Sequence, residues 1–376
     1  MRNLISFIIV TCLIFLLTGC FGAKEIEGET YVTALGMDYK EGEFKLYIQG
    51  LNFGNIAKQE GGPLEQQPIL IGEAKGESLA AAIGLLEQLT ALPLNYGHVK
   101  TIILSENILK EKMEVVMDLV SRSPLLRYNI LLFGTGENLK SLMETQSFFN
   151  YPPLFTVIHR PEEIIHYNYS LPIIKYHQFT SRFSRPVGTT LIPSLIIDDT
   201  HFTEGKKKSI AQINGEYVFS RQQFTGWLSK KDFSGLRWFT GKNQDMFIRP
   251  GNENLSVRVR NLKTKILVLK GKTPSYKIVV KGKGLLIQNS KNKQLKEVEN
   301  EINKIIKNEI LSTLKKGDQL NTDVLNISEK SYKYYLNHWN TNTIRGFNEH
   351  SIKQIQVKIR LEPGNFKYGN AKKDAA

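Results

Sequence analysis

The spacing of apolar residues predicts alternating strands and helices in the first 150 residues. Five apolar stretches have the length and composition of strands: residues 31–37, 44–48, 69–71, 99–104 and 128–133. Three stretches between or after them have helical spacing: residues 78–92, 107–120 and 139–143. Ser78 is a candidate N-cap for the first helix, and Pro93 ends it. Strands that alternate with helices predict a layered α/β region.

Residues 148–200 show no sustained period. Aromatic residues and prolines are interspersed there, and only one short helix is predicted, after Pro161. Aromatic residues at this density line either a partner surface or a core. The large area that each ring buries favours a core.

A polar, basic stretch at residues 203–209 is the best candidate for a domain boundary. Beyond it, residues 211–219 and 224–228 read as paired strands, and residues 242–254 as a second connector. The sequence therefore predicts an N-terminal domain over residues 20–200 and a middle module over residues 201–254.

The last part of the chain predicts a two-layer α+β domain over residues 255–366, followed by a polar tail at 367–376. Gly271 and Gly282 mark turn or bulge positions, and Gly317 is predicted to end the long helix. The expected elements are three strands at 255–259, 266–268 and 278–280, helices at 292–316 and 329–338, and a final strand at 352–361. The predicted fold class is mixed α/β and α+β, with three domains.

The N-terminus has the layout of a secretory signal. A basic Arg2 precedes an apolar run at residues 4–17, and Leu17-Thr18-Gly19-Cys20 resembles a lipobox. The run is shorter than the roughly 20 residues that span a bilayer. We therefore predict a signal peptide at residues 1–19 and a diacylglyceryl anchor on Cys20, which two acyl chains make stable. A plain signal peptide with a chance cysteine is the alternative.

Charge is distributed unevenly along the chain, whose formal net charge is +14. Residues 21–200 hold 15 basic and 21 acidic residues, whereas residues 201–376 hold 34 and 15. Residues 255–316 alone hold 16 basic and 4 acidic residues. Such a surface suits anionic lipid headgroups or an acidic partner, and export argues against nucleic acid. A solvated basic surface with no specific target is the alternative.

Known catalytic and cofactor motifs do not occur in the sequence. A complete P-loop, a glycine-rich dinucleotide fingerprint, a G-x-S-x-G elbow and an H-E-x-x-H motif are all lacking. The seven histidines are scattered. The sequence therefore predicts no enzyme, no cofactor and no metal site, although catalytic groups can lie far apart in a sequence.

Several motifs, in their order, resemble the Ger(x)C lipoproteins, the C subunits of nutrient germinant receptors in spore-forming bacteria. The opening strand ends in Gly36-Met37-Asp38, and Tyr96-Gly97-His98-Val99-Lys100 follows a helix. Gly235-Leu236-Arg237-Trp238 is similar to the middle motif of the family, and Leu336-Asn337-His338-Trp339 to its end. At residues 321–326 only Asp323 persists from the glycine-rich turn of the family.

The resemblance implies a non-catalytic, lipid-anchored subunit on the outer face of the spore inner membrane. It also implies association with the A and B subunits of a receptor that triggers germination. Cys20 is then the lipidation site, and Asp38, Gly97, His98, Lys100 and Trp238 are structural or interface positions. For Gly97 and His98 we expect a tight turn with a buried histidine in preference to a ligand contact.

Two other classes of protein remain alternatives. An exported solute-binding lipoprotein of a transporter needs two similar lobes around a cleft, but the two halves differ in pattern and charge. A lipid-anchored cell-wall hydrolase needs a clustered acid or metal site, and the sequence shows none.

Overall fold

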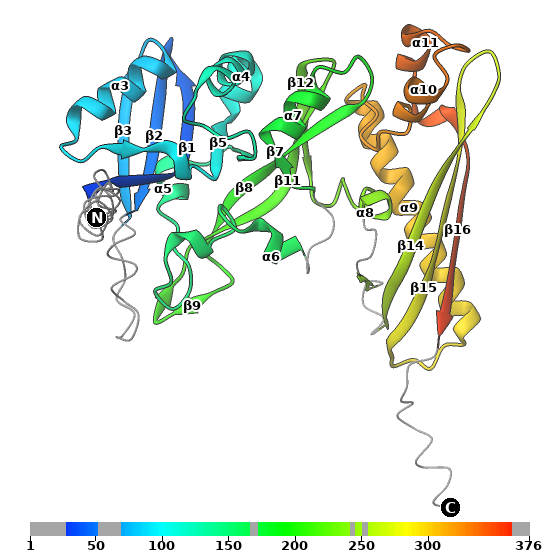
Figure 1. Cartoon of the computed structure of the whole chain (residues 1–376). Coiled ribbons are helices and arrows are strands. Elements are labelled where there is room, and N and C mark those ends of the chain that lie inside the picture. The colour runs from blue at the N-terminus through cyan, green and yellow to red at the C-terminus, as the bar shows by residue number, and fades with distance from the viewer. Residues whose placement is uncertain (1–27, 52–68, 166–171, 241–244, 250–254, 363–376) are drawn as a thin grey trace, which may run out of the picture.

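The chain folds around two main β-sheets (Figure 1). This computed structural model describes residues 28–51, 69–165, 172–240, 245–249 and 255–362. The predicted signal peptide, Cys20 and the polar tail lie outside the described residues, as do the loop before residue 69 and most of the connector at 242–254.

The first sheet has ten strands, and its main path runs β12-β11-β8-β6-β5-β1-β2-β3. β5, β6 and β8 continue in parallel from β1, whereas β2 and β3 on one side and β11 and β12 on the other are antiparallel. The short strands β4 and β7 pair with β1 and β6. The strands are β1 (Thr30–Lys40), β2 (Glu43–Leu51), β3 (Leu70–Gly76), β4 (Leu94–Asn95), β5 (Thr101–Ser105), β6 (Leu131–Thr135), β7 (Ile174–Lys175), β8 (Thr189–Asp198), β11 (Ile210–Ser220) and β12 (Gln223–Ser229).

Helices cover both faces of this sheet and bury two apolar clusters. The predicted start of the first helix is confirmed, because the Ser78 hydroxyl accepts a hydrogen bond from the amide of Ala81 at 3.1 Å. The second predicted helix begins with a π-helical segment, η3 (Ile108–Lys112). The helices are α3 (Leu79–Leu89), α4 (Met113–Arg122), α5 (Leu139–Met143), α6 (Pro161–Ile165) and α7 (Tyr176–Phe183), with 3₁₀ turns η2 (Tyr96–His98) and η4 (Pro153–Phe155).

The prediction of irregular structure for residues 148–200 was wrong in its second half, which contains α7 and the ten-residue strand β8. β8 has no polar–apolar alternation because its first seven residues are all buried. Pro193 also argues against a central strand. Pro193 is tolerated in β8 because it lies just outside the part of the strand that pairs with β6, which is Ser194 and Leu195.

The structure differs from the expected division at residue 200. β11 hydrogen-bonds to β8 along ten residue pairs, from Ile210–Asp198 to Ser220–Thr189. Together with β12 it completes the first sheet, so the stretch 201–254 forms no separate middle sheet beyond the small β9 (Thr203–Glu204) and β10 (Lys206–Lys207) pair. The polar stretch at residues 203–209 is therefore a hairpin within the domain and not a domain boundary. The sequence could not show this, because strand pairing between distant segments leaves no local pattern.

The second sheet and one long helix form the predicted two-layer C-terminal domain. Residues 255–269 are one strand and not the two that we expected. Gly282 lies inside a strand, opposite a register shift between Arg260 and Lys263, which agrees with the predicted bulge position. The long helix continues past Gly317. A larger residue would not fit at this position, because its Cβ would lie 2.7 Å from the carbonyl oxygen of Thr322. The elements are α8 (Arg237–Thr240), β13 (Met246–Ile248), β14 (Leu255–Leu269), β15 (Ser275–Asn289), α9 (Leu295–Gln319), α10 (Glu329–Tyr334), α11 (Thr341–Arg345), η5 (Glu349–Ser351) and β16 (Ile352–Glu362).

One apolar cluster contains residues from both sheets. Leu191, Val218 and Leu228 reach it from β8, β11 and β12, and Trp238 and the buried face of α9 meet them. The N-terminal and C-terminal domains therefore share buried surface, which holds them together more firmly than a flexible linker does.

Candidate functional site

The Gly97-His98 motif forms the 3₁₀ turn η2 between β4 and β5. The side-chain oxygen of Asn95 accepts a hydrogen bond from the Gly97 amide at 3.0 Å. His98 packs edge-on against the ring of Tyr31, with centroids 4.9 Å apart. The turn was expected, but His98 is exposed and not buried, which leaves its ring at the protein surface.

A cavity of about 250 Å³ opens beside this turn. Gly97, His98 and Lys100 line it, together with residues that are distant in sequence. The latter include Arg127, Asn129, His159, Glu162 and Lys175. Neither spacing nor composition pointed to these five, because they come from the loop before β6, from the segment around α6 and from β7.

His159 is the one fully enclosed polar side chain of this cavity wall, with 4% of its surface exposed. Its Nε2 lies 2.7 Å from Oε1 of Gln49, whose Nε2 donates to the carbonyl of Met143 at 2.7 Å. Since that amide orientation makes Oε1 an acceptor, His159 Nε2 is the donor. Burial, with a smaller contribution from Lys100, lowers the pKa of His159 to about 3.

The other motif residues lie elsewhere. Asp38 is at the opposite end of β1 from the η2 turn, where it pairs with Lys45 of β2. Trp238 is completely buried in the cluster that joins the two domains. The structure therefore groups Gly97, His98 and Lys100 but separates them from Asp38 and Trp238.

Trp238 and its neighbours fasten the segment after β12 to the long helix. The Trp238 indole donates to Oε2 of Glu309 at 2.7 Å, and Arg237 forms an ion pair with the same carboxylate at 2.5 Å. Gly235 lies so close to α9 that a Cβ would be 2.6 Å from the carbonyl oxygen of Glu309. This motif positions the C-terminal domain against the first sheet, and Arg237 and Glu309 also line an open surface cavity of about 350 Å³.

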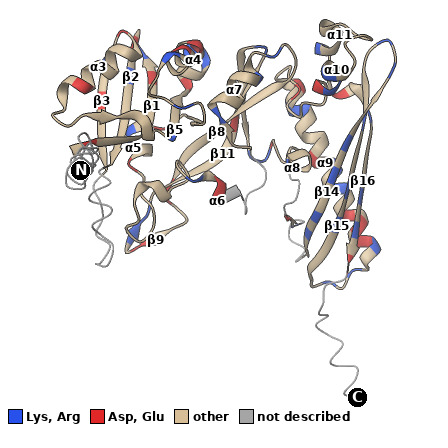
Figure 2. Cartoon of the chain, viewed as in Figure 1, with Lys and Arg blue, Asp and Glu red and all other residues tan. Residues whose placement is uncertain are grey.

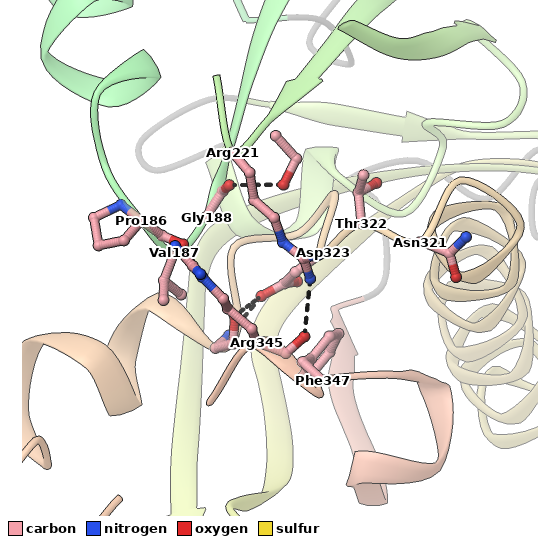
Figure 3. Close-up of a pocket in the computed structure, with 11 residues that line it drawn as sticks. Pro186, Val187, Gly188, Arg221, Asn321, Thr322, Asp323, Arg345 and Phe347 are labelled. Atoms are coloured by element: carbon pink, nitrogen blue, oxygen red, sulfur yellow. Dashed lines mark hydrogen bonds between the residues drawn. The ribbon is translucent and has the colours of Figure 1, made fainter. Parts of the chain in front are cut away.

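Figure 3 shows a second small cavity, where the turn before β8 meets the C-terminal domain. Arg345 donates to the carbonyl of Pro186 at 2.9 Å, and Arg221 donates to the carbonyl of Arg345 at 3.2 Å. The cavity volume of about 20 Å³ has room for about one water molecule. These contacts hold the two domains together and leave no room for a metabolite.

Asp323, which also lines this cavity, is buried. Its Oδ2 accepts hydrogen bonds from the amide and hydroxyl of Ser328 at 2.6 and 2.7 Å. Burial nevertheless raises the pKa of Asp323. Asp323, the one residue of the family's glycine-rich turn that is present here, therefore stabilises the loop before α10 through these hydrogen bonds.

The strands of the C-terminal sheet carry many Lys and Arg residues (Figure 2), and on the exposed face of the sheet these residues form rows. Lys263, Lys281 and Lys358 are directly opposite one another on β14, β15 and β16. All three are exposed, and none has an ion pair within the described part of the chain. The adjacent row is Arg260, Lys283 and Arg360, where Glu362 is the only counter-charge among the residues that the structure describes. We call these six residues the basic face.

Like charges opposite one another on neighbouring strands destabilise a sheet. The basic face is therefore unfavourable for the isolated fold and is suited to a negatively charged surface.

Within the described ranges, no group of three or more His, Cys, Asp or Glu residues is placed to hold a metal ion. Among the same residues, no helix has the length and apolar character needed to cross a membrane.

Comparison with known proteins covers almost the whole chain. Residues 22–197 match the family described as the spore germination protein N-terminal domain, and residues 214–362 match the spore germination B3/GerAC-like C-terminal family. The two matches meet near the hairpin of β9 and β10, although β11 and β12 beyond it belong to the first sheet.

Individual relatives are distant but extend over the same length. Spore germination protein KC of Bacillus subtilis is 21% identical over 90% of this chain and 89% of its own. Spore germination protein GerQC of Bacillus cereus is 22% identical over 96% and 97%. The putative spore germination protein YfkR of Bacillus subtilis is 20% identical over 85% of each.

The fold also matches a solved structure, the crystal structure of the GerBC protein. The TM-score is 0.50 at 17% identity, and the match covers 88% of this chain and 97% of that one. The mixed α/β architecture with N- and C-terminal domains is thus shared. Because both domain families match in order and over most of the chain, this protein belongs to the Ger(x)C family of spore germination proteins, the C subunits of germinant receptors.

Proposed function

We propose that this chain is a non-catalytic, lipid-anchored subunit of a nutrient germinant receptor, needed for the assembly or signalling of that receptor. The observation that carries the proposal is the match of both domains to spore germination families over nearly the whole chain. The receptor subunit family is not a known enzyme family, and the buried motifs around Trp238 and Asp323 serve packing.

The proposed anchor is Cys20, which would hold the protein at the outer face of the spore inner membrane. Its support is the lipobox at residues 17–20, since two acyl chains give stable attachment. Replacing Cys20 with Ala should release the protein from spore membranes. Continued tight membrane association of the Cys20→Ala protein would contradict the anchor.

The basic face would add an electrostatic contact with anionic lipid headgroups. Each lysine near such a surface contributes about 1 kcal/mol to the free energy of binding. Replacing Lys263, Lys281 and Lys358 with Gln should therefore weaken binding to anionic lipid by about 3 kcal/mol. The assay is binding of the Cys20→Ala chain to vesicles with and without anionic lipid. Equal loss in a control triple variant of the exposed Lys140, Lys206 and Lys207 would refute a specific role for the face.

Receptor membership is tested by recovering the tagged protein from spore membranes. We expect co-purification of the membrane-embedded A subunit and the transporter-like B subunit. Recovery of transporter ATPase components would instead favour an exported solute-binding lipoprotein. That alternative needs two similar lobes around a cleft, whereas the two sheets differ in strand order and share a buried apolar cluster.

A further inference from the structure

We infer that the cavity beside the Gly97-His98 turn binds a small oxyanion that also carries a hydrogen-bond donor, such as a hydrogen phosphate group or a 2-hydroxycarboxylate. The inference does not depend on the receptor proposal. It follows from the charges that line the cavity and from one acceptor atom in its wall.

Three cations converge on this cavity from separate elements. Lys100 precedes β5, Arg127 lies in the loop before β6, and Lys175 is in β7, where it pairs with Leu131 of β6. None of the three forms an ion pair with another described residue. Glu162 is the only carboxylate among the residues that line the cavity. The excess of positive charge selects an anion.

The cations are fixed to the sheet by the backbone around them. The Lys100 amide donates to the carbonyl of Thr33 at 2.9 Å, and the carbonyl of Lys100 accepts from the Leu131 amide at 2.8 Å. These bonds join the stretch between η2 and β5 to β1 and β6. Lys100 is thus held at the edge of the sheet by regular backbone pairing, and this preorganisation lowers the entropic cost of binding a ligand.

Besides the three cations, the proposed site uses the second ring nitrogen of His159, Nδ1. Nε2 is the donor to Gln49, so Nδ1 of the neutral ring carries a bare lone pair. Nδ1 is buried and has no hydrogen-bond partner. A buried acceptor without a partner destabilises a fold. His159 lines the cavity, and its Nδ1 is closed to solvent in this structure, so a small turn of the ring is needed before a ligand can donate a hydrogen bond to it.

Together these groups distinguish between anions. Sulfate satisfies the cations but brings only oxygen lone pairs to His159. Hydrogen phosphate carries the same charge at about pH 8 and retains one proton to donate. Lactate and acetate form a second pair, because only lactate has a hydroxyl donor. A volume of about 250 Å³ restricts the ligand to small molecules.

The test is isothermal titration calorimetry on the full chain in non-ionic detergent, at about pH 8 and constant ionic strength. We expect phosphate to bind at least about tenfold more tightly than sulfate, and lactate more tightly than acetate, since one hydrogen bond is worth about this factor. Absence of binding by all four anions would overturn the inference. Equal affinities within each pair would overturn the role of His159.

Variants separate the cavity from unspecific attraction. Arg127→Gln and Lys175→Gln each remove a cation and should weaken phosphate binding at least about tenfold. Lys140→Gln removes an exposed cation from α5 and should leave binding unchanged. An equal loss in all three variants would place the anion outside the cavity. His159→Gln should remove the preference for phosphate over sulfate, and the two cation variants remain decisive if this variant fails to fold.

Discussion

Glu216 provides a direct test of burial within the first sheet. It lies in β11 opposite Pro193 of β8 and Leu228 of β12, and none of its surface is exposed. Neither carboxylate oxygen has a hydrogen-bond partner. Burial raises the pKa of Glu216 well above its ordinary value. The folded protein therefore holds a proton on this side chain that the unfolded chain releases at neutral pH.

The size of the effect follows from proton linkage. An unfolded Glu has a pKa of about 4.3, and each pH unit above it costs about 1.4 kcal/mol for a group that must stay protonated. Keeping Glu216 protonated at pH 7 thus costs up to about 3.7 kcal/mol. Because the pKa is raised on folding, the contribution is most favourable below about pH 4 and is lost as pH rises toward the folded pKa.

Glu216→Gln keeps the shape of the side chain and removes the titration. In urea unfolding, the variant should be more stable than the unsubstituted protein by about 1 kcal/mol at pH 5. This difference in the free energy of unfolding should grow by about 1.4 kcal/mol per pH unit toward pH 7. The matched control is Glu87→Gln on the exposed face of α3, where we expect no such growth. A stability difference for Glu216→Gln that does not change with pH would refute the reasoning.

Three further changes probe other contacts. Trp238→Ala should lower the free energy of unfolding by about 3–5 kcal/mol, because it opens the shared cluster and leaves Glu309 without its indole donor. Thermal unfolding measures this loss, and a loss below about 1 kcal/mol would contradict the anchoring role. Asn326→Ala removes two hydrogen bonds to the backbone of Thr189, at 2.6 and 3.0 Å. It should cost about 1–3 kcal/mol and speed amide exchange at the start of β8, and unchanged exchange would argue against this link. His159 has a pKa near 3 when folded and about 6.5 when unfolded, so the folded state loses about 1.4 kcal/mol per unit as pH falls between these values. His159→Gln should remove that part of the slope in urea unfolding, and an unaltered slope would contradict burial of a neutral ring.

Local sequence patterns determined the elements whose signals are short-range. The Ser78 cap starts α3 as predicted, the polar residues 40–43 form the turn between β1 and β2, and β16 follows the predicted alternation. The apolar positions of α9 face the C-terminal sheet at the expected helical spacing. In these segments one face is buried and the other is solvated, so the period of the sequence shows the element. The order of motifs such as Gly97-His98 and Gly235–Trp238 also indicated the family.

The tertiary structure decided what depends on distant partners. β8 is buried without alternation because strands and helices cover both of its faces, and β11 and β12 join the first sheet through pairing across a polar hairpin. The cations Lys100, Arg127 and Lys175 lie near His159 only because strand pairing, parallel between β5 and β6 and antiparallel between β6 and β7, brings separate segments to one edge. A local pattern records how each residue meets solvent, but strand pairing and cavity formation depend on free energies summed over segments far apart in the chain.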